Sequence, residues 1–92
     1  MIRRFRHRGL ERLFRSGDTS EINSQHAARL RRMLGTLNSS TGPSGMNVPG
    51  YRLHPLRGDR RGQWAVSVSG NWRLVFEFEG EDATNVDLLD YH

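Results

Sequence analysis

The chain has 92 residues, a hydrophobic share of 35% and a net charge of +4. This length predicts one domain, spanning residues 1–92, with a thin hydrophobic core. Cysteine is absent, which excludes disulfides and thiolate metal sites. No hydrophobic run approaches the roughly 20 residues of a membrane helix. We therefore expect a soluble, cytoplasmic protein with no membrane partner.

The charge is divided unevenly along the chain. Residues 1–35 carry nine arginines and three acidic residues, residues 36–73 carry five arginines and one acidic residue, and residues 74–92 carry six acidic residues and no arginine. This division predicts a strongly positive face, which suits a phosphate backbone or an acidic protein. The chain has no lysine, and arginine stays protonated at neutral pH. Any general acid or base must therefore be His, Asp, Glu or Tyr.

The first residues predict a short strand and then a helix. Residues 1–6, with Ile2 and Phe5 as hydrophobic positions, have the pattern of an edge strand. Residues 9–15 place their large hydrophobic side chains on one helical face and arginines on the other. Gly17 is well placed to end this helix in a left-handed cap.

A second helix is expected from Asn23, or the residue after it, to about Leu37. His7 and His26 lie among arginines, and we predict that both are surface residues. Residues 38–50 form a long polar loop, and loops of this length are functional or mobile.

The second half of the chain predicts an antiparallel meander. Hydrophobic and polar residues alternate in residues 64–68 and 72–78, and a last strand carries Val86 and Leu88. A three-residue loop at 69–71 aligns the hydrophobic faces and predicts three facing pairs: Trp64 with Phe76, Val66 with Leu74, and Val68 with Trp72. The predicted fold is α+β, with a short N-terminal strand and two helices packed on one face of a mostly antiparallel sheet.

The chain ends in three side chains that can transfer protons: Asp90, Tyr91 and His92. They follow a hydrophobic strand, which is expected to hold them in place. In a meander, the loop around Gly70 and the end of the last strand lie at the same end of the sheet. Asn71 and Arg73 are therefore expected to approach the C-terminal residues.

A second candidate group surrounds His54, which precedes a proline. A histidine in this position is more often a turn residue than a catalyst. Arg57, Arg60 and Arg61 form either a solvated turn or, together with Arg73, a phosphate-binding cluster.

Other motifs point away from cofactors. Trp64 and Trp72 alternate with Val and Leu, which indicates core packing rather than stacking on bases. No pair of histidines or carboxylates has the spacing of metal ligands, and phosphate-loop and dinucleotide-binding motifs are absent. We predict no metal and no cofactor.

The candidate residues suit cleavage of RNA. A base must deprotonate a 2′-hydroxyl, positive charge must stabilise the phosphorane, and an acid must protonate the leaving 5′-oxygen. His54 and His92 supply two titratable groups, and Arg57 and Arg73 supply fixed charge. Asp90 can orient His92. The sequence does not decide which histidine is the base.

The chain resembles the HigB-type toxins of the RelE superfamily. The resemblance covers the whole chain and is carried by these segments in order: residues 1–10, 13–14, 53–60, 62–64, 71–74, 76–78 and 90–92. It implies a ribosome-dependent mRNA endonuclease that cuts the message in the decoding site. It also implies a helix-turn-helix antitoxin, HigA-like, through which alone the toxin reaches operator DNA.

The resemblance further implies roles for individual residues. The catalytic set is His54, Asp90, Tyr91 and His92; Arg57 and Arg73 bind the scissile phosphate, and Asn71 supports the site. The family commonly has lysine in place of Arg57, so this chain should keep phosphate binding there and lose any proton donation. Two alternatives remain: a non-catalytic basic module that binds RNA or the ribosome, and a regulatory protein that acts only with its antitoxin.

Overall fold

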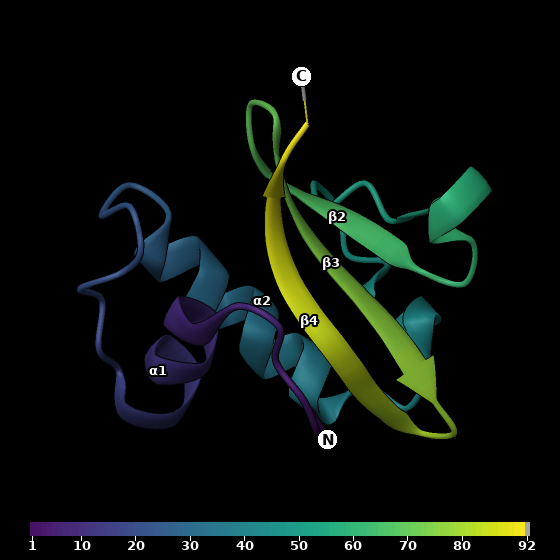
Figure 1. Ribbon diagram of the computed structural model, residues 1–92, viewed down its shortest axis with the longest axis horizontal. Coiled ribbons are helices and arrows are strands. Elements are labelled where there is room, and N and C mark those ends of the chain that lie inside the picture. Colours follow the sequence, from purple (N-terminus) through teal and green to yellow (C-terminus); the bar gives the residue numbers. More distant parts are fainter. Residues whose placement is uncertain (92) are drawn as a thin grey trace.

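The computed structural model describes residues 1–91, and His92 lies outside the described residues. Two helices pack against a four-stranded antiparallel sheet in the strand order β1-β2-β3-β4 (Figure 1). The elements are, in chain order, α1 (Arg8–Ser16), α2 (Ala27–Ser39), the 3-10 turn η1 (Pro43–Met46), β1 (His54–Pro55), the 3-10 turn η2 (Gly58–Arg60), β2 (Trp64–Ser69), β3 (Trp72–Glu79) and β4 (Asp82–Asp90). The predicted α+β fold is confirmed.

The N-terminal segment runs parallel to β4, as an edge of the sheet. It pairs through isolated bridges, Ile2 with Ala83 and Phe5 with Val86, rather than as a continuous strand. The backbone N–H of Arg3 donates to Ala83 O at 2.8 Å. This pairing confirms the predicted edge segment, and α1 begins directly after it, at Arg8.

Helix α1 is defined by a cap at each end. The Nδ1 atom of His7 accepts a hydrogen bond from the N–H of Leu10 at 3.1 Å, so the histidine acts as the N-cap. Gly17 ends the helix with φ = 74°, the left-handed cap that the sequence predicts. His7 is half-buried, and the cap that its ring makes was not predicted from the sequence.

Helix α2 begins at Ala27, later than predicted. The side chain of Asn23 accepts from the N–H of Gln25 at 2.9 Å, so Asn23 closes a separate turn before the helix. His26 is the N-cap residue and is only 7% exposed, which corrects the prediction of a surface position. Its ring meets Trp72 edge-on, with 6.0 Å between ring centroids.

The core lies between the two helices and one face of the sheet. Four α2 residues, Leu30, Met33, Leu34 and Leu37, are fully buried there together with sheet residues such as Val66, Leu74, Phe76 and Val86. Trp64 and Trp72 are partly buried against this core, which confirms the prediction that they pack rather than stack on bases. Met46 of η1 is also fully buried, so the loop of residues 38–50 is fixed to the core.

The β2–β3 hairpin differs from prediction by one residue. Trp64 pairs with Phe76 and Val66 pairs with Leu74, as predicted, but Ser69 takes the place of Val68 opposite Trp72. A bulge between Ser67 and Ser69 absorbs the extra residue. The connection is therefore a two-residue turn, which Gly70 permits with φ = 54°.

None of the helices in residues 1–91 is both long and hydrophobic enough to cross a bilayer.

Candidate nucleic-acid cleavage site

The candidate residues lie mainly on the face of the sheet that the helices leave uncovered. Directly paired residues project to the same face, and successive residues of a strand alternate between faces. Because Leu74 and Phe76 face the helices, Arg73 and Val75 face away from them. Two rows cross this outer face: Ser67, Arg73 and Leu89 form one, and His54, Ala65, Val75 and Asp87 form the other.

The end of β4 lies beside the β2–β3 turn, as the meander predicts (Figure 1). Arg73 pairs with Leu89, Trp72 pairs with Asp90, and the N–H of Tyr91 donates to Asn71 O at 2.8 Å. The expected approach of Asn71 and Arg73 to the C-terminal residues is confirmed for Asp90 and Tyr91. The same expectation for His92 falls outside the described residues.

The guanidinium of Arg73 is fixed at this end of the sheet. Its Nη1 atom donates to Gly70 O at 2.7 Å and to Trp72 O at 3.1 Å, so the half-buried side chain folds back over the turn. Two backbone carbonyls therefore hold a permanent positive charge next to the Asn71–Tyr91 contact. Such a preorganised charge suits a phosphate group.

His54 lies on β1, at the other edge of the same face. Its Nδ1 atom is 2.9 Å from Arg52 O, and the imidazole is half-buried. A carbonyl oxygen only accepts hydrogen bonds, so Nδ1 carries the proton in this contact and Nε2 is the nitrogen left to exchange protons.

Three strand spacings separate β1 from β4, which is about 14 Å of sheet. The structure thus brings Asn71, Arg73, Asp90 and Tyr91 together and places His54 on the far edge of the same sheet, with the buried Ala65 and the half-buried Ser67 between them. Asp90 pairs with Trp72, which shares the helix-facing side of β3 with Leu74, so Asp90 projects to the helix side and not to the face of Arg73.

Comparison with known proteins identifies the family. Residues 3–92 match the HigB-like toxins, described as RelE-like toxins of the type II toxin–antitoxin system HigB. The chain belongs to this family. It is also 40% identical to the endoribonuclease HigB of Proteus vulgaris over 92 residues, which cover all of both chains. The chain is therefore a type II toxin, and its partner is an antitoxin.

The toxin's remaining candidate arginines form a separate group. Arg57 is the exposed residue that precedes η2, and Arg60 lies at the end of η2. Both come before Trp64 at the start of β2, whereas Arg73 pairs with Ser67 towards the end of that strand. The structure therefore does not join these arginines and Arg73 in one cluster.

Sequence reasoning missed a polar chain that holds Arg60. The Arg60 guanidinium donates to Gln63 Oε1 at 3.0 Å, and Gln63 Nε2 donates to Glu77 Oε2 at 3.1 Å. The Asn85 amide donates to the same carboxylate oxygen at 3.3 Å. Asn85 has φ = 52°, at a bulge of β4. The alternation of Glu77 with Phe76 and Phe78 was the available signal that this carboxylate lies on the outer face.

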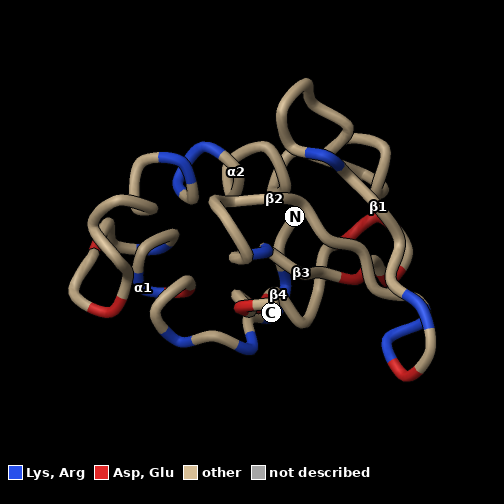
Figure 2. Tube along the Cα trace, turned by 90° about the horizontal axis from the view of Figure 1, so that it is seen from above, with Lys and Arg blue, Asp and Glu red and all other residues tan. Residues whose placement is uncertain are grey.

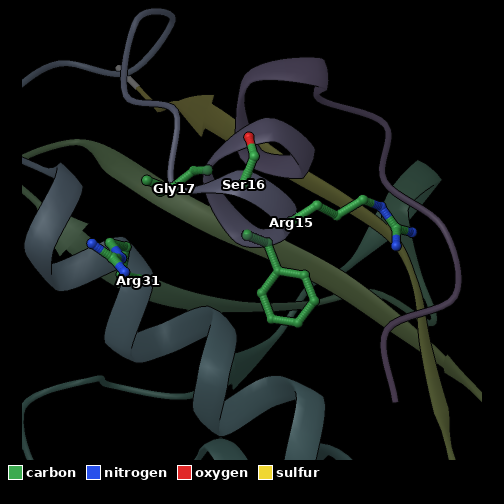
Figure 3. A pocket seen from close by; sticks show the side chains of 6 residues that line it. Arg15, Ser16, Gly17 and Arg31 are labelled. Carbon is green, nitrogen blue, oxygen red and sulfur yellow. The ribbon is translucent and has the colours of Figure 1, made fainter.

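A hollow on the helical side of the toxin is distinct from this face. It has a volume of about 410 Å³ and lies where α1 ends beside α2, lined by residues such as Phe14, Arg15, Gly17 and Arg31 (Figure 3). Within residues 1–91, no group of three His, Asp or Glu side chains is placed to hold a metal ion.

Proposed function

We propose that this toxin is a ribosome-dependent endoribonuclease that cuts mRNA in the decoding site by metal-independent acid–base catalysis. The observation that carries the proposal is that His54 lies on the same sheet face as Arg73, on the face opposite the helices, with Asn71 and Tyr91 in contact beside Arg73. The 40% identity to a relative named as an endoribonuclease supports it.

The face suits a single RNA strand. Between His54 and Arg73 this face presents the half-buried Ser67, whereas Ala65 is fully buried. An RNA strand laid over Ser67 would meet His54 on one side and Tyr91 on the other. Arg73 would meet the phosphate, and Asn71 would support that end of the site. Arg57 and Arg60, in the connection between β1 and β2, would add further contacts to the RNA backbone.

The chemistry follows from the groups present. One imidazole removes the proton of the 2′-hydroxyl, and the oxygen attacks the adjacent phosphorus. The 5′-oxygen leaves and takes a proton from the second acid, which yields a 2′,3′-cyclic phosphate and a 5′-hydroxyl end. The nucleophile is internal to RNA, so the reaction requires no metal to generate it.

Residue roles follow the same scheme. His54, through Nε2, and His92 would be the proton-transfer pair, and Tyr91 would act as a further proton donor. Arg73 would stabilise the phosphorane, because a fixed charge costs no reorganisation as negative charge develops. Asp90, which the family resemblance places in the catalytic set, would orient His92.

The partners follow from this activity. The substrate would be the mRNA and the partner would be the ribosome, so the toxin would act in the cytoplasm. The antitoxin would be a helix-turn-helix protein, HigA-like, and the toxin would reach operator DNA only through it.

Primer extension on a defined mRNA tests the proposal, with purified toxin and with or without translating ribosomes. We expect cuts only with ribosomes, and their loss in His54→Ala and His92→Gln. His7→Asn is the control histidine variant, because asparagine also caps helices. Cuts in free RNA would indicate an ordinary ribonuclease. No cuts in either condition would favour a non-catalytic binding module.

A further inference from the structure

Arg29, on the helical side of the toxin, reaches the segment that precedes His54. Its Nη2 atom donates to Gly50 O at 3.0 Å and to Ser67 O at 3.2 Å. Its guanidinium lies over the ring of Tyr51, 5.4 Å from the centroid. Its Nε atom is buried without a hydrogen-bond partner among the described residues. One side chain of α2 therefore ties together the chain before β1 and the backbone of β2.

The hydrogen bond from Arg29 to Ser67 O replaces one that a regular pairing of β1 with β2 would make. His54 pairs with Ala65, so a regular antiparallel ladder would place Arg52 opposite Ser67. Instead, the N–H of Ser67 donates to Tyr51 O at 2.7 Å, one residue out of register. The guanidinium of Arg29 then supplies a hydrogen bond to Ser67 O in place of a strand N–H.

The displaced residue, Arg52, adopts a left-handed conformation with φ = 55°. This conformation is uncommon for a residue other than glycine. It accompanies the contact of Arg52 O with His54 Nδ1 at 2.9 Å. The ladder gives little other support to His54, because β1 has only two residues and the second, Pro55, has no N–H.

We infer that Arg29 is a positioning residue for His54. Arg29 completes the hydrogen bonding of Ser67 and so holds the left-handed turn at Arg52. The Arg52 carbonyl then accepts the Nδ1 proton of His54. This contact leaves Nε2 available for catalysis. The catalytic part of this inference rests on the proposed function. The effect on the imidazole does not, and can be measured without RNA.

The tautomer of His54 is the first test. In toxin with ¹⁵N-labelled histidine, at a pH where the rings are neutral, ¹⁵N shifts report which ring nitrogen carries the proton. His54→Gln assigns the signal. We expect the Nδ1–H form in the wild type and a shift towards the Nε2–H form, which free imidazole side chains prefer, in Arg29→Met. Arg32→Met, an exposed arginine of the same helix, should match the wild type. An Nε2–H wild type, or no change in Arg29→Met, would overturn the inference.

Single-turnover cleavage at saturating ribosomes is the second test. Arg29→Met should lower the rate on the order of 10- to 100-fold, as expected for a misplaced catalytic group, with unchanged ribosome affinity. Arg29→Lys should recover part of the rate, because its ammonium can still donate to a carbonyl.

A pair of variants at exposed Arg52 keeps the inference testable if Arg29→Met does not fold. Arg52→Gly and Arg52→Val both remove the arginine side chain, but glycine tolerates a positive φ and the β-branched valine does not. The glycine variant should keep the cleavage rate and the Nδ1–H tautomer, and the valine variant should lose both. Equal behaviour of the two would refute the positioning role. A wild type that never cuts would refute the proposed function and leave the tautomer result intact.

Discussion

Two candidate residues, Arg73 and His54, are held by backbone carbonyls rather than by other side chains. Arg73 donates to Gly70 O and Trp72 O, and His54 contacts Arg52 O. The orientation of both groups therefore depends on the local path of the backbone. The sequence alone was enough to single out Arg73 and His54 as candidates. It did not predict their hydrogen bonds to backbone carbonyls, because these depend on the bulge in the β2–β3 hairpin and on the left-handed turn at Arg52.

Arg73→Gln should lower the cleavage rate on ribosomes by roughly 10²- to 10³-fold, the cost of removing one preorganised donor to a developing oxyanion. Arg73→Lys should retain an intermediate rate, because it keeps the charge and loses the fork. Single-turnover cleavage measures both, and thermal denaturation checks that the variants are folded. A full rate in Arg73→Gln would remove this residue from the site.

At the scale of elements, hydrophobic periodicity predicted the helices, the strands and the meander. It placed Asn71 and Arg73 beside Asp90 and Tyr91 correctly, because in a meander that neighbourhood is fixed by strand order alone. It missed the start of α2 and the one-residue bulge before Ser69. Both depend on competition between local and tertiary contacts, which a single sequence does not reveal.

The misassigned histidine shows this competition. His26 lies four residues before Leu30 and thus on the same helical stripe as the core residues, but its polarity among arginines indicated the surface. The ring contact with Trp72 attaches the start of α2 to the sheet near the candidate site. Its side chain makes no cap hydrogen bond, so packing is its contribution.

We therefore expect His26→Ala to lower the free energy of unfolding by about 1–3 kcal/mol, from the lost ring pair and the cavity left behind. Urea denaturation measures the change. The exposed neighbour provides a matched control: Gln25→Ala should stay within about 0.5 kcal/mol of the wild type. Equal stability of the two variants would mean that the ring contact does not hold α2 in place.

At the scale of the whole molecule, the fold brings part of the acidic C-terminal third next to the arginine-rich N-terminal segment, as in the ion pair of Arg3 with Asp82. Arginines lie on the N-terminal segment, along the helices and around η2, and acidic residues lie at the β3–β4 turn and the end of β4, with others on α1 and in the loop after it (Figure 2). Some arginines are paired locally, such as Arg15 with Glu11 at 2.9 Å. Exposed Arg4 and Arg6, on the segment beside β4, make none of the salt bridges found among residues 1–91.

The exposed arginines predict that ribosome binding depends strongly on salt concentration. Each arginine–phosphate contact releases counterions, so affinity should fall steeply as salt rises. If Arg4 and Arg6 each contact a phosphate, replacing both with glutamine should reduce the slope of log affinity against log salt by about 1 per contact. Ribosome pelleting across a salt series measures this slope for the wild type and for the double variant. Gln25→Ala, an exposed change without charge, should leave the slope unaltered. A flat salt response in the wild type would mean that docking depends on protein contacts. An unaltered slope in the double variant would instead place the phosphate contacts on the other arginines, because counterion release counts only the charges that the phosphates meet.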